Sequence, residues 1–216
     1  MAHFIAYQAV NMNDLPGWST FESGGPVTTP IENGAELQIM FTDGFVFDLK
    51  NLAGHSFTYG PPPDINPTLT GGTISSLQVD LNDSIVYKFT GLQLLVHSGF
   101  AADILAGHFH AALELLLAGN DTIRGSPGND ILVGGPRHNT FVYTTKHFGQ
   151  DTITNFTVND RIEFSHTIFH NLAQVQHHSH VDAHGHVVIV ADASDTITLD
   201  TIHHVSGLTV SEFLFI

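Results

Sequence analysis

Acidic and amide side chains recur at nine-residue intervals in the middle of the chain. The stretch from Leu116 to Val142 divides into three nonapeptides, and their sixth residues are Asp121, Asp130 and Asn139. Their eighth residues are Ile123, Leu132 and Phe141. The first five places are rich in glycine, which permits tight turns in which backbone carbonyls converge on one point. Carbonyl and carboxylate oxygens are the ligands that Ca²⁺ prefers, so the spacing predicts repeated turns that can bind calcium.

The repeated pattern is close to G-G-x-G-x-D-x-U-x, and in this respect the segment resembles the RTX, or haemolysin-type, calcium-binding repeat family. The resemblance implies a parallel β-roll in which six residues form a turn, three form a short strand, and two nonapeptides make one coil. Calcium would lie between turns that are two repeats apart, and one to three ions are expected. The candidate ligands under this resemblance are Ala118, Asn120, Asp121, Gly125, Pro127, Asn129, Asp130, Gly134, Pro136, Asn139 and Asp151.

The resemblance also implies which turns stack. The turn that carries Asp121 would lie on the turn that carries Asn139, and the turn with Asp130 would lie on a turn of the following segment. That segment contains a Phe-Gly-Gln-Asp turn before a Thr-Ile strand, similar to the closing segment of the family. Asp151 is therefore the first candidate partner of Asp130, and Asp160, in the next turn, is the second.

The third nonapeptide departs from the pattern. Asn139 keeps one oxygen but lacks the charge of a carboxylate, so we expect weaker calcium binding there. Pro136 and Arg137 also differ from the repeat. Gly-Asn-Asp tripeptides occur in turns that hold no metal, and this remains the alternative. Two such units in register at nine residues favour the calcium-binding interpretation.

Histidines are concentrated near the end of the chain, and imidazole is the commonest metal ligand. Because alternate residues of a strand share a face, His178 pairs with His180 and His184 pairs with His186. A hairpin that turns at Asp182–Gly185 would bring the two pairs together around Zn²⁺ or Ni²⁺. The alternative is an exposed polar loop. We favour this alternative, because the sequence shows no acidic partner that would orient the imidazoles.

Period-two alternation predicts strands in the first hundred residues. Residues 37–41 and 45–49 alternate around Asp43-Gly44, which is typical of an antiparallel hairpin. Further strands are predicted at Ser56–Tyr59, Thr73–Leu81 and Ser84–Thr90, the last two joined by an Asn-Asp turn.

Residues 101–117 change to a helical period, with one apolar face that includes Ile104, Leu113 and Leu116. Asp103 is interpreted as a residue of the helix start, and His108 as a packed histidine rather than a metal ligand. After the repeats, strands are predicted at Val187–Val190 and Thr196–Leu199 around an Asp-rich turn.

The predicted fold is mainly β. It comprises an N-terminal antiparallel β domain (1–97), a linking amphipathic helix (98–118), a short parallel RTX β-roll (119–163) and an antiparallel C-terminal cap (164–216). The cap resembles the segment that follows RTX rolls in proteins exported by bacterial type I machinery. Its last residues, Ser211–Ile216, resemble the uncleaved acidic-then-apolar signal of that system.

Composition excludes several classes of function. The 216 residues include 6 Lys and Arg against 21 Asp and Glu, a formal net charge of −15, so we expect no nucleic-acid partner. The chain contains no cysteine, which excludes disulfides, thiolate metal sites and cysteine nucleophiles. No apolar run is long enough to span a membrane, and the first residues lack the features of a cleaved secretory signal peptide.

These observations predict a secreted, extracellular bacterial protein that leaves the cell unfolded and folds when its repeats bind calcium. The expected role is binding or adhesion, with a surface polysaccharide as the partner class. The alternative is a secreted hydrolase or polysaccharide-modifying enzyme with its active site in the N-terminal β domain. The sequence contains neither HExxH nor GxSxG, and the hairpin explains Asp43 and Asp48 without chemistry, so we expect no enzymatic activity.

Overall fold

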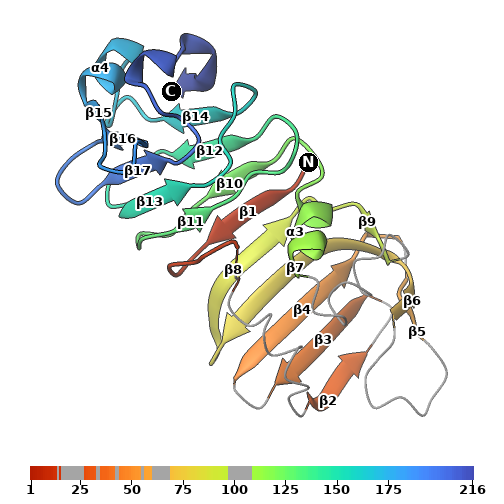
Figure 1. Cartoon of the computed structure of the whole chain (residues 1–216). Coiled ribbons are helices and arrows are strands. Elements are labelled where there is room, and N and C mark those ends of the chain that lie inside the picture. Colours follow the sequence, from red (N-terminus) through yellow and green to blue (C-terminus); the bar gives the residue numbers. More distant parts are fainter. Residues whose placement is uncertain are drawn as a thin grey trace. The chain divides into compact units, whose positions relative to one another are not determined.

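The computed structural model describes residues 1–13, 15, 27–32, 35–41, 44–54, 56–59, 69–96 and 109–216 (Figure 1). It is mainly β, as the sequence predicts. The chain forms two compact units. The N-terminal unit comprises residues 1–4 and 14–116, and the C-terminal unit comprises residues 5–13 and 117–216. This division differs from the predicted ranges chiefly because the segment 5–13 belongs to the C-terminal unit.

The N-terminal unit contains an antiparallel sheet with the strand order β8-β7-β4-β3-β2. The strands of this unit are β2 (Val27–Glu32), β3 (Glu36–Phe41), β4 (Phe45–Asn51), β5 (Thr58–Tyr59), β6 (Leu69–Gly71), β7 (Thr73–Leu81), β8 (Ser84–Thr90) and β9 (Leu94–Leu95). β5 pairs with β6, and β9 pairs with β7. The predicted strands at 73–81 and 84–90 coincide with β7 and β8, and the one at 56–59 shortens to β5.

Two tight turns set the register of this sheet. Gly44 has a φ of +91°, a left-handed conformation that glycine adopts without strain, and it precedes β4. The resulting register places Leu37 opposite Leu49, and both side chains are buried. Asn82 and Asp83 join β7 to β8 with φ values of 49° and 62°. Short polar side chains tolerate this region, so the predicted turn forms. Asp43 lies outside the described residues.

Asp48, on β4, is a buried carboxylate in the N-terminal unit. It is 7% exposed, its Oδ2 lies 3.5 Å from Lys50 Nζ, and its Oδ1 has no hydrogen-bond partner. Burial, followed by the neighbouring Glu36 carboxylate, raises the pKa of Asp48 to about 6. The ion pair with the half-exposed Lys50 opposes this effect without cancelling it.

We expect acid to stabilise the N-terminal unit through Asp48. Its pKa is higher in the folded state than its usual 3.8, so its contribution is complete below pH 3.8 and is lost as the pH rises through about 6. Asp48→Asn should remove about 1–3 kcal/mol of this pH dependence of the unfolding free energy. Urea unfolding of both proteins across this pH range measures the difference. The matched control is Asp80→Asn on β7, and parallel profiles for the wild type and Asp48→Asn would contradict the assignment.

Two short α-helices are described. α3 (Phe109–Leu116) is the end of the predicted helix, and its buried residues Ala112, Leu113 and Leu116 lie on the expected apolar face. Residues 97–108, including Asp103 and His108, lie outside the described part of the chain. α4 (Leu172–His177) begins after Asn171, whose side chain accepts a hydrogen bond from the backbone N–H of Gln174. Among the described residues, no helix has the length and apolar character needed to cross a membrane.

Parallel strands form a β-roll in the C-terminal unit. One sheet has the order β10-β12-β14-β18, and the other has β11-β13-β17 and continues into β16 and β15. Thr122 lies opposite Thr140, which is 18 residues or two nonapeptides later, as predicted. The strands are β10 (Thr122–Arg124), β11 (Ile131–Leu132), β12 (Thr140–Tyr143), β13 (Gln150–Ile153), β14 (Arg161–Phe164), β15 (Ser179–Val181), β16 (Val187–Val190), β17 (Thr196–Leu199) and β18 (Phe213–Phe215).

Apolar residues of the short strands form the core of the roll. The eighth residues of the three nonapeptides, Ile123, Leu132 and Phe141, are fully buried, which confirms their predicted role. Later coils supply Ile153, Ile162 and Leu199, also fully buried. The alternation of one buried and one outward residue holds the turns at the two edges of the roll.

The predicted antiparallel cap is antiparallel only in part. β15, β16 and β17 pair antiparallel, and β16 and β17 coincide with the predicted strands. However, β17 also pairs in parallel with β13, and β18 pairs in parallel with β14. The Phe213 and Phe215 rings stack on Phe164 at 6.1 and 6.5 Å, because continuing the coil buries aromatic surface that an open end would expose. The roll thus extends to residues 213–215, beyond the predicted 163. The 3₁₀ turns Val205–Gly207 and Val210–Glu212 precede this last strand.

Residues near the N-terminus complete the roll at its other end, which the sequence did not predict. The backbone N–H of Met12 donates to the Ile131 carbonyl, and the N–H of Ile131 donates to the Val10 carbonyl, both at 2.8 Å. Asn11 forms a parallel bridge with Ile131. This segment therefore bridges to β11 in parallel, although it contains no glycine and no repeat motif.

Candidate metal centre

The turns of the roll stack in two columns, one at each edge. In the first column, the N–H of Asp121 donates to Asn139 Oδ1 at 3.1 Å, and the N–H of Asn139 donates to Asp160 Oδ1 at 2.8 Å. In the second column, the N–H of Asp130 donates to Asp151 Oδ1 at 2.9 Å. The predicted stacking of Asp121 on Asn139 and of Asp130 on Asp151 is therefore confirmed. Asp160 belongs to the first column and is not a partner of Asp130.

Asp130 is held rigidly by backbone and hydroxyl donors. Its Oδ1 accepts a hydrogen bond from the N–H of Val10 at 2.6 Å, and its Oδ2 accepts one from the N–H of Ser126 at 2.7 Å. Ser126 Oγ lies 3.0 Å from Asp130 Oδ2. Burial nevertheless raises the pKa of Asp130. These donors hold the carboxylate in one orientation.

Asp151 differs from Asp130 because one of its carboxylate oxygens has no hydrogen-bond partner. The side chain is 1% exposed, Oδ1 is bound by Asp130, and the buried Oδ2 has no hydrogen-bond partner. The Tyr143 hydroxyl is close enough to lower the pKa of Asp151 as a hydrogen-bond donor, although neither this hydroxyl nor Asp151 Oδ2 has a partner in good hydrogen-bonding geometry. Burial, with repulsion from Asp130 adding to it, raises the pKa of Asp151 to about 8. A buried oxygen of this kind requires a proton or a cation.

The missing side chain of Gly125 leaves space beside both carboxylates. A Cβ atom at this position would lie 2.7 Å from Asp130 Oδ2 and 3.3 Å from Asp151 Oδ2. Any larger residue would fill the place where the two carboxylates converge. Glycine at the first place of this nonapeptide is therefore needed for the close approach, and the backbone there stays accessible to an ion.

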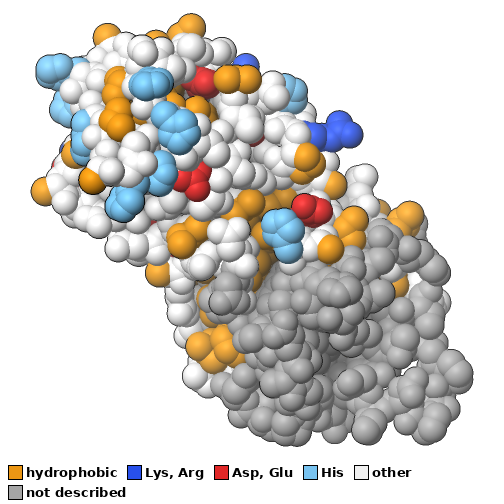
Figure 2. Space-filling view, viewed as in Figure 1, with side chains coloured by type: hydrophobic (Ala, Val, Ile, Leu, Met, Phe, Trp, Pro, Cys, Tyr) orange, Lys and Arg blue, Asp and Glu red, His pale blue; other side chains and the backbone are white. Residues whose placement is uncertain are grey.

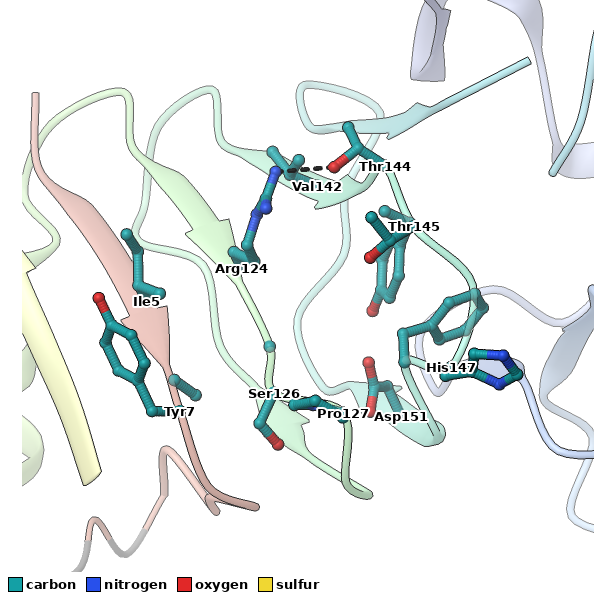
Figure 3. A pocket seen from close by; sticks show the side chains of 14 residues that line it. Ile5, Tyr7, Arg124, Ser126, Pro127, Val142, Thr144, Thr145, His147 and Asp151 are labelled. Atoms are coloured by element: carbon teal, nitrogen blue, oxygen red, sulfur yellow. Dashed lines mark hydrogen bonds between the residues drawn. The ribbon is translucent and has the colours of Figure 1, made fainter. Parts of the chain in front are cut away.

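A cavity of about 380 Å³ lies against this pair of turns (Figure 3). The side chain of Asp151 lies at its inner end, between Ser126 and His147. Arg124 extends along the opposite side, and its Nη2 donates to Thr144 Oγ1 at 2.8 Å. Tyr7, which is 48% exposed, directly follows the strand β1 (His3–Ala6). Of the two acids of this turn pair, Asp151 is the one that lines the cavity.

Comparison with known families agrees with this geometry. Residues 117–140 match the model of the RTX calcium-binding nonapeptide repeat in four copies. Residues 117–140 carry RTX calcium-binding repeats. The matched residues carry the turns of Asp121, Asp130 and Asn139, and calcium binding is the property that this repeat confers. No curated protein matches the chain at a significant level.

The other predicted RTX ligands have their own positions in the turns. The third-place residues Ala118, Pro127 and Pro136 are exposed. The fifth-place side chains Asn120 and Asn129 link stacked turns, because their Oδ1 atoms accept hydrogen bonds from the N–H groups of His138 and Gln150.

Gly134 is engaged differently from Gly125. Its N–H donates to Asn155 Oδ1 at 2.7 Å, and its carbonyl accepts from Asn155 Nδ2. The Gly134 carbonyl is therefore already hydrogen-bonded. Asn155 follows the Thr-Ile strand, and nothing in the repeat pattern indicated its role.

Sequence reasoning missed several residues that shape the RTX turns. Val10 and Ser126 orient Asp130, and Tyr143 faces Asp151. The fully buried Asp195 accepts hydrogen bonds from the N–H groups of His147 and Gly149, and so fixes the loop that leads to Asp151. Only Ser126 lies within the repeat, so only its position could have suggested a contact with the sixth-place aspartate.

The histidines do not form the site predicted for Zn²⁺ or Ni²⁺. The hairpin does turn at Asp182–Gly185, but His178 packs against Phe169 at the other end. His184 instead stacks on His186, at a centroid distance of 6.0 Å. His180 lies opposite Val188 on the exposed edge strand β15, and Figure 2 shows histidines spread over this surface. In the described part of the chain, no three His, Asp or Glu side chains are grouped to hold a metal. A calcium ion must therefore rely on backbone oxygens as well as carboxylates.

Proposed function

We propose that the RTX roll binds calcium between the turns of Asp130 and Asp151. The observation that carries this proposal is the buried Oδ2 of Asp151, which has no hydrogen-bond donor although it lies next to a second carboxylate. Leaving such an oxygen unpaired costs about 1–3 kcal/mol or more. A divalent cation offsets this cost and the repulsion between the two acids, and calcium is the ion that prefers carboxylate and carbonyl oxygens.

The residues that would hold the ion are Asp130, Asp151 and the backbone oxygens of the turn that begins at Gly125. Bound calcium would supply positive charge and link two stacked turns. The chain's own groups orient the two carboxylates. Val10 and Ser126 aim the Asp130 carboxylate, and the N–H of Asp130 aims that of Asp151. We propose one ion at this pair of turns, within the expected range of one to three.

Calcium binding in such a site contributes directly to folding, because the stacked turns exist only in the folded chain. We propose that the protein is exported by bacterial type I machinery and that its roll folds outside the cell, where calcium is abundant. The repeat type and its acidic ligands support this proposal. Extracellular calcium modules typically bind at about 10⁻⁴–10⁻³ M, which keeps the roll open in a calcium-poor cytoplasm.

A calcium titration of the full chain tests the proposal. We expect near-saturating binding by isothermal calorimetry at millimolar calcium, with a stoichiometry of at least one, and an increase in β signal by circular dichroism. EGTA should reverse both, and magnesium at the same concentration should not replace calcium. Identical spectra and melting temperatures with and without calcium would refute a calcium-dependent roll.

We further propose a binding role, with an acidic surface polysaccharide as the ligand class. The cavity beside Asp151 supports this choice, because an exposed aromatic ring at Tyr7, a guanidinium at Arg124 and hydroxyls at Thr144 and Thr145 are groups that contact sugars and their carboxylates. A glycan array with and without EDTA tests the role. Tyr7→Ala and Arg124→Ala should lose glycan binding and keep calcium binding, whereas unchanged binding by both variants would remove the cavity from consideration.

The proposed role is not enzymatic. In the N-terminal unit, the buried acid Asp48 is paired with Lys50, and this pairing accounts for it as a structural residue. Asp43, the other acid of that hairpin, lies outside the described residues. Turnover of a polysaccharide by the purified chain, lost in Asp48→Asn, would overturn this proposal in favour of a hydrolase.

A further inference from the structure

The side chain of Asn139 is fully hydrogen-bonded inside the third turn of the roll. It is 1% exposed. Its Nδ2 donates to the carbonyls of Gly135 and Arg137 at 2.8 and 3.2 Å, and to Asp160 Oδ1 at 3.1 Å. Its Oδ1 accepts from the N–H of Asp121 at 3.1 Å. The amide orientation is fixed. Exchanging Nδ2 and Oδ1 would place the oxygen against three acceptor oxygens and the nitrogen against the N–H of Asp121.

The oxygens around Asn139 Nδ2 are those of a cation site. Two backbone carbonyls and one carboxylate oxygen converge on a single atom, and these are the ligand types that calcium takes in proteins. The distances of 2.8–3.2 Å are hydrogen-bond lengths. They exceed the roughly 2.3–2.6 Å of calcium ligation. A polar N–H₂ group therefore occupies the centre of an oxygen-lined turn.

The turn of Asp130 shows the opposite arrangement at the same place in the repeat. There the second residue, Ser126, points its N–H at the carboxylate, whereas the second residue of the third turn, Gly135, points its carbonyl at the amide. A carboxylate only accepts, and an amide nitrogen only donates. The backbone of each turn has adopted the orientation that satisfies its own sixth residue.

We propose that the Asn139 amide replaces a calcium ion in the first column, so that the turns of Asn139 and Asp160 are held together without metal. This inference rests on the proposed calcium site at Asp130 and Asp151, and it assigns opposite calcium requirements to the two turn pairs. The turns of Asn139 and Asp160 are closed by the chain alone, and the turns of Asp130 and Asp151 are closed by calcium. In the third nonapeptide, the amide at the sixth place then takes over the role of the ion, and the turn is not a weaker calcium site.

Asn139→Asp tests the proposal, because the introduced carboxylate would meet two carbonyls and Asp160 with no donor between them. Native mass spectrometry of the full chain should count one more calcium ion than in the wild type. In EGTA the melting temperature should fall by on the order of 5–10 °C, and calcium should restore it. The matched control is Asn82→Asp, which adds a carboxylate in an exposed turn of the N-terminal unit, and it should leave the calcium count unchanged.

A second variant keeps the test decisive if Asn139→Asp does not fold. Asp160→Asn should keep the calcium count of the wild type, because the turns of Asn139 and Asp160 hold no ion between them. Loss of one ion by Asp160→Asn, or an unchanged count in folded Asn139→Asp, would overturn the inference. If the wild type binds no calcium, the proposed site at Asp151 is wrong. A gain of one ion by Asn139→Asp would still support the amide clamp.

Discussion

Asp151→Asn is expected to abolish most of the stabilisation that calcium gives to the roll. At a calcium concentration 100 times the dissociation constant, binding to the folded state stabilises it by about 2.7 kcal/mol. In a unit of this size, that corresponds to a rise in melting temperature on the order of 10 °C. The variant retains an oxygen that can accept from the N–H of Asp130, but it loses the charge and the unpartnered Oδ2. Its melting temperature should change by less than about 2 °C on addition of calcium.

Differential scanning calorimetry of both proteins, in EGTA and in about 10 mM calcium, measures this effect. The matched control is Asp83→Asn, which removes a carboxylate from an exposed turn of the N-terminal unit where asparagine tolerates the positive φ. It should respond to calcium as the wild type does. A calcium-induced shift of equal size in Asp151→Asn would place the ion elsewhere.

Gly135→Ala should destabilise the roll more than any other small substitution in its turns. A Cβ atom at Gly135 would lie 1.7 Å from the Leu117 carbonyl oxygen and 2.8 Å from its carbon. Both contacts are with backbone, so no side-chain rotation relieves them, and the stacked turns must separate. We expect a loss of about 3 kcal/mol in unfolding free energy and a melting temperature lower by roughly 10 °C or more.

Gly207→Ala is the matched control for this clash. A Cβ atom there would meet only Ile202 Cγ2 at 3.7 Å, an ordinary van der Waals contact. Its unfolding free energy should stay within about 0.5 kcal/mol of the wild type in urea unfolding. Equal stability of the two alanine variants would show that the turns at Leu117 and Gly135 separate without cost.

Local sequence patterns predicted much of the fold. The strands β7, β8, β16 and β17 were predicted to the residue, because alternation on a half-buried strand and turn residues such as Asn82 act over short distances. The nonapeptide period predicted both the buried Ile123, Leu132 and Phe141 and the stacking of Asp130 on Asp151. A repeat supplies long-range information, because equal spacing places equivalent residues above one another.

The tertiary structure decided those contacts that no periodic pattern in the sequence predicts. The segment around Val10 joins the roll because an edge strand at β11 offers unpaired backbone groups, and 120 residues separate Val10 from the Asp130 carboxylate that it contacts. The histidine pairs separate because His178 packs on Phe169, a contact that depends on how α4 lies against the coil. The role of Asn139 was likewise set by its surroundings. Its residue type predicted a weak calcium site, but whether an amide binds an ion or replaces one depends on which way the surrounding carbonyls point.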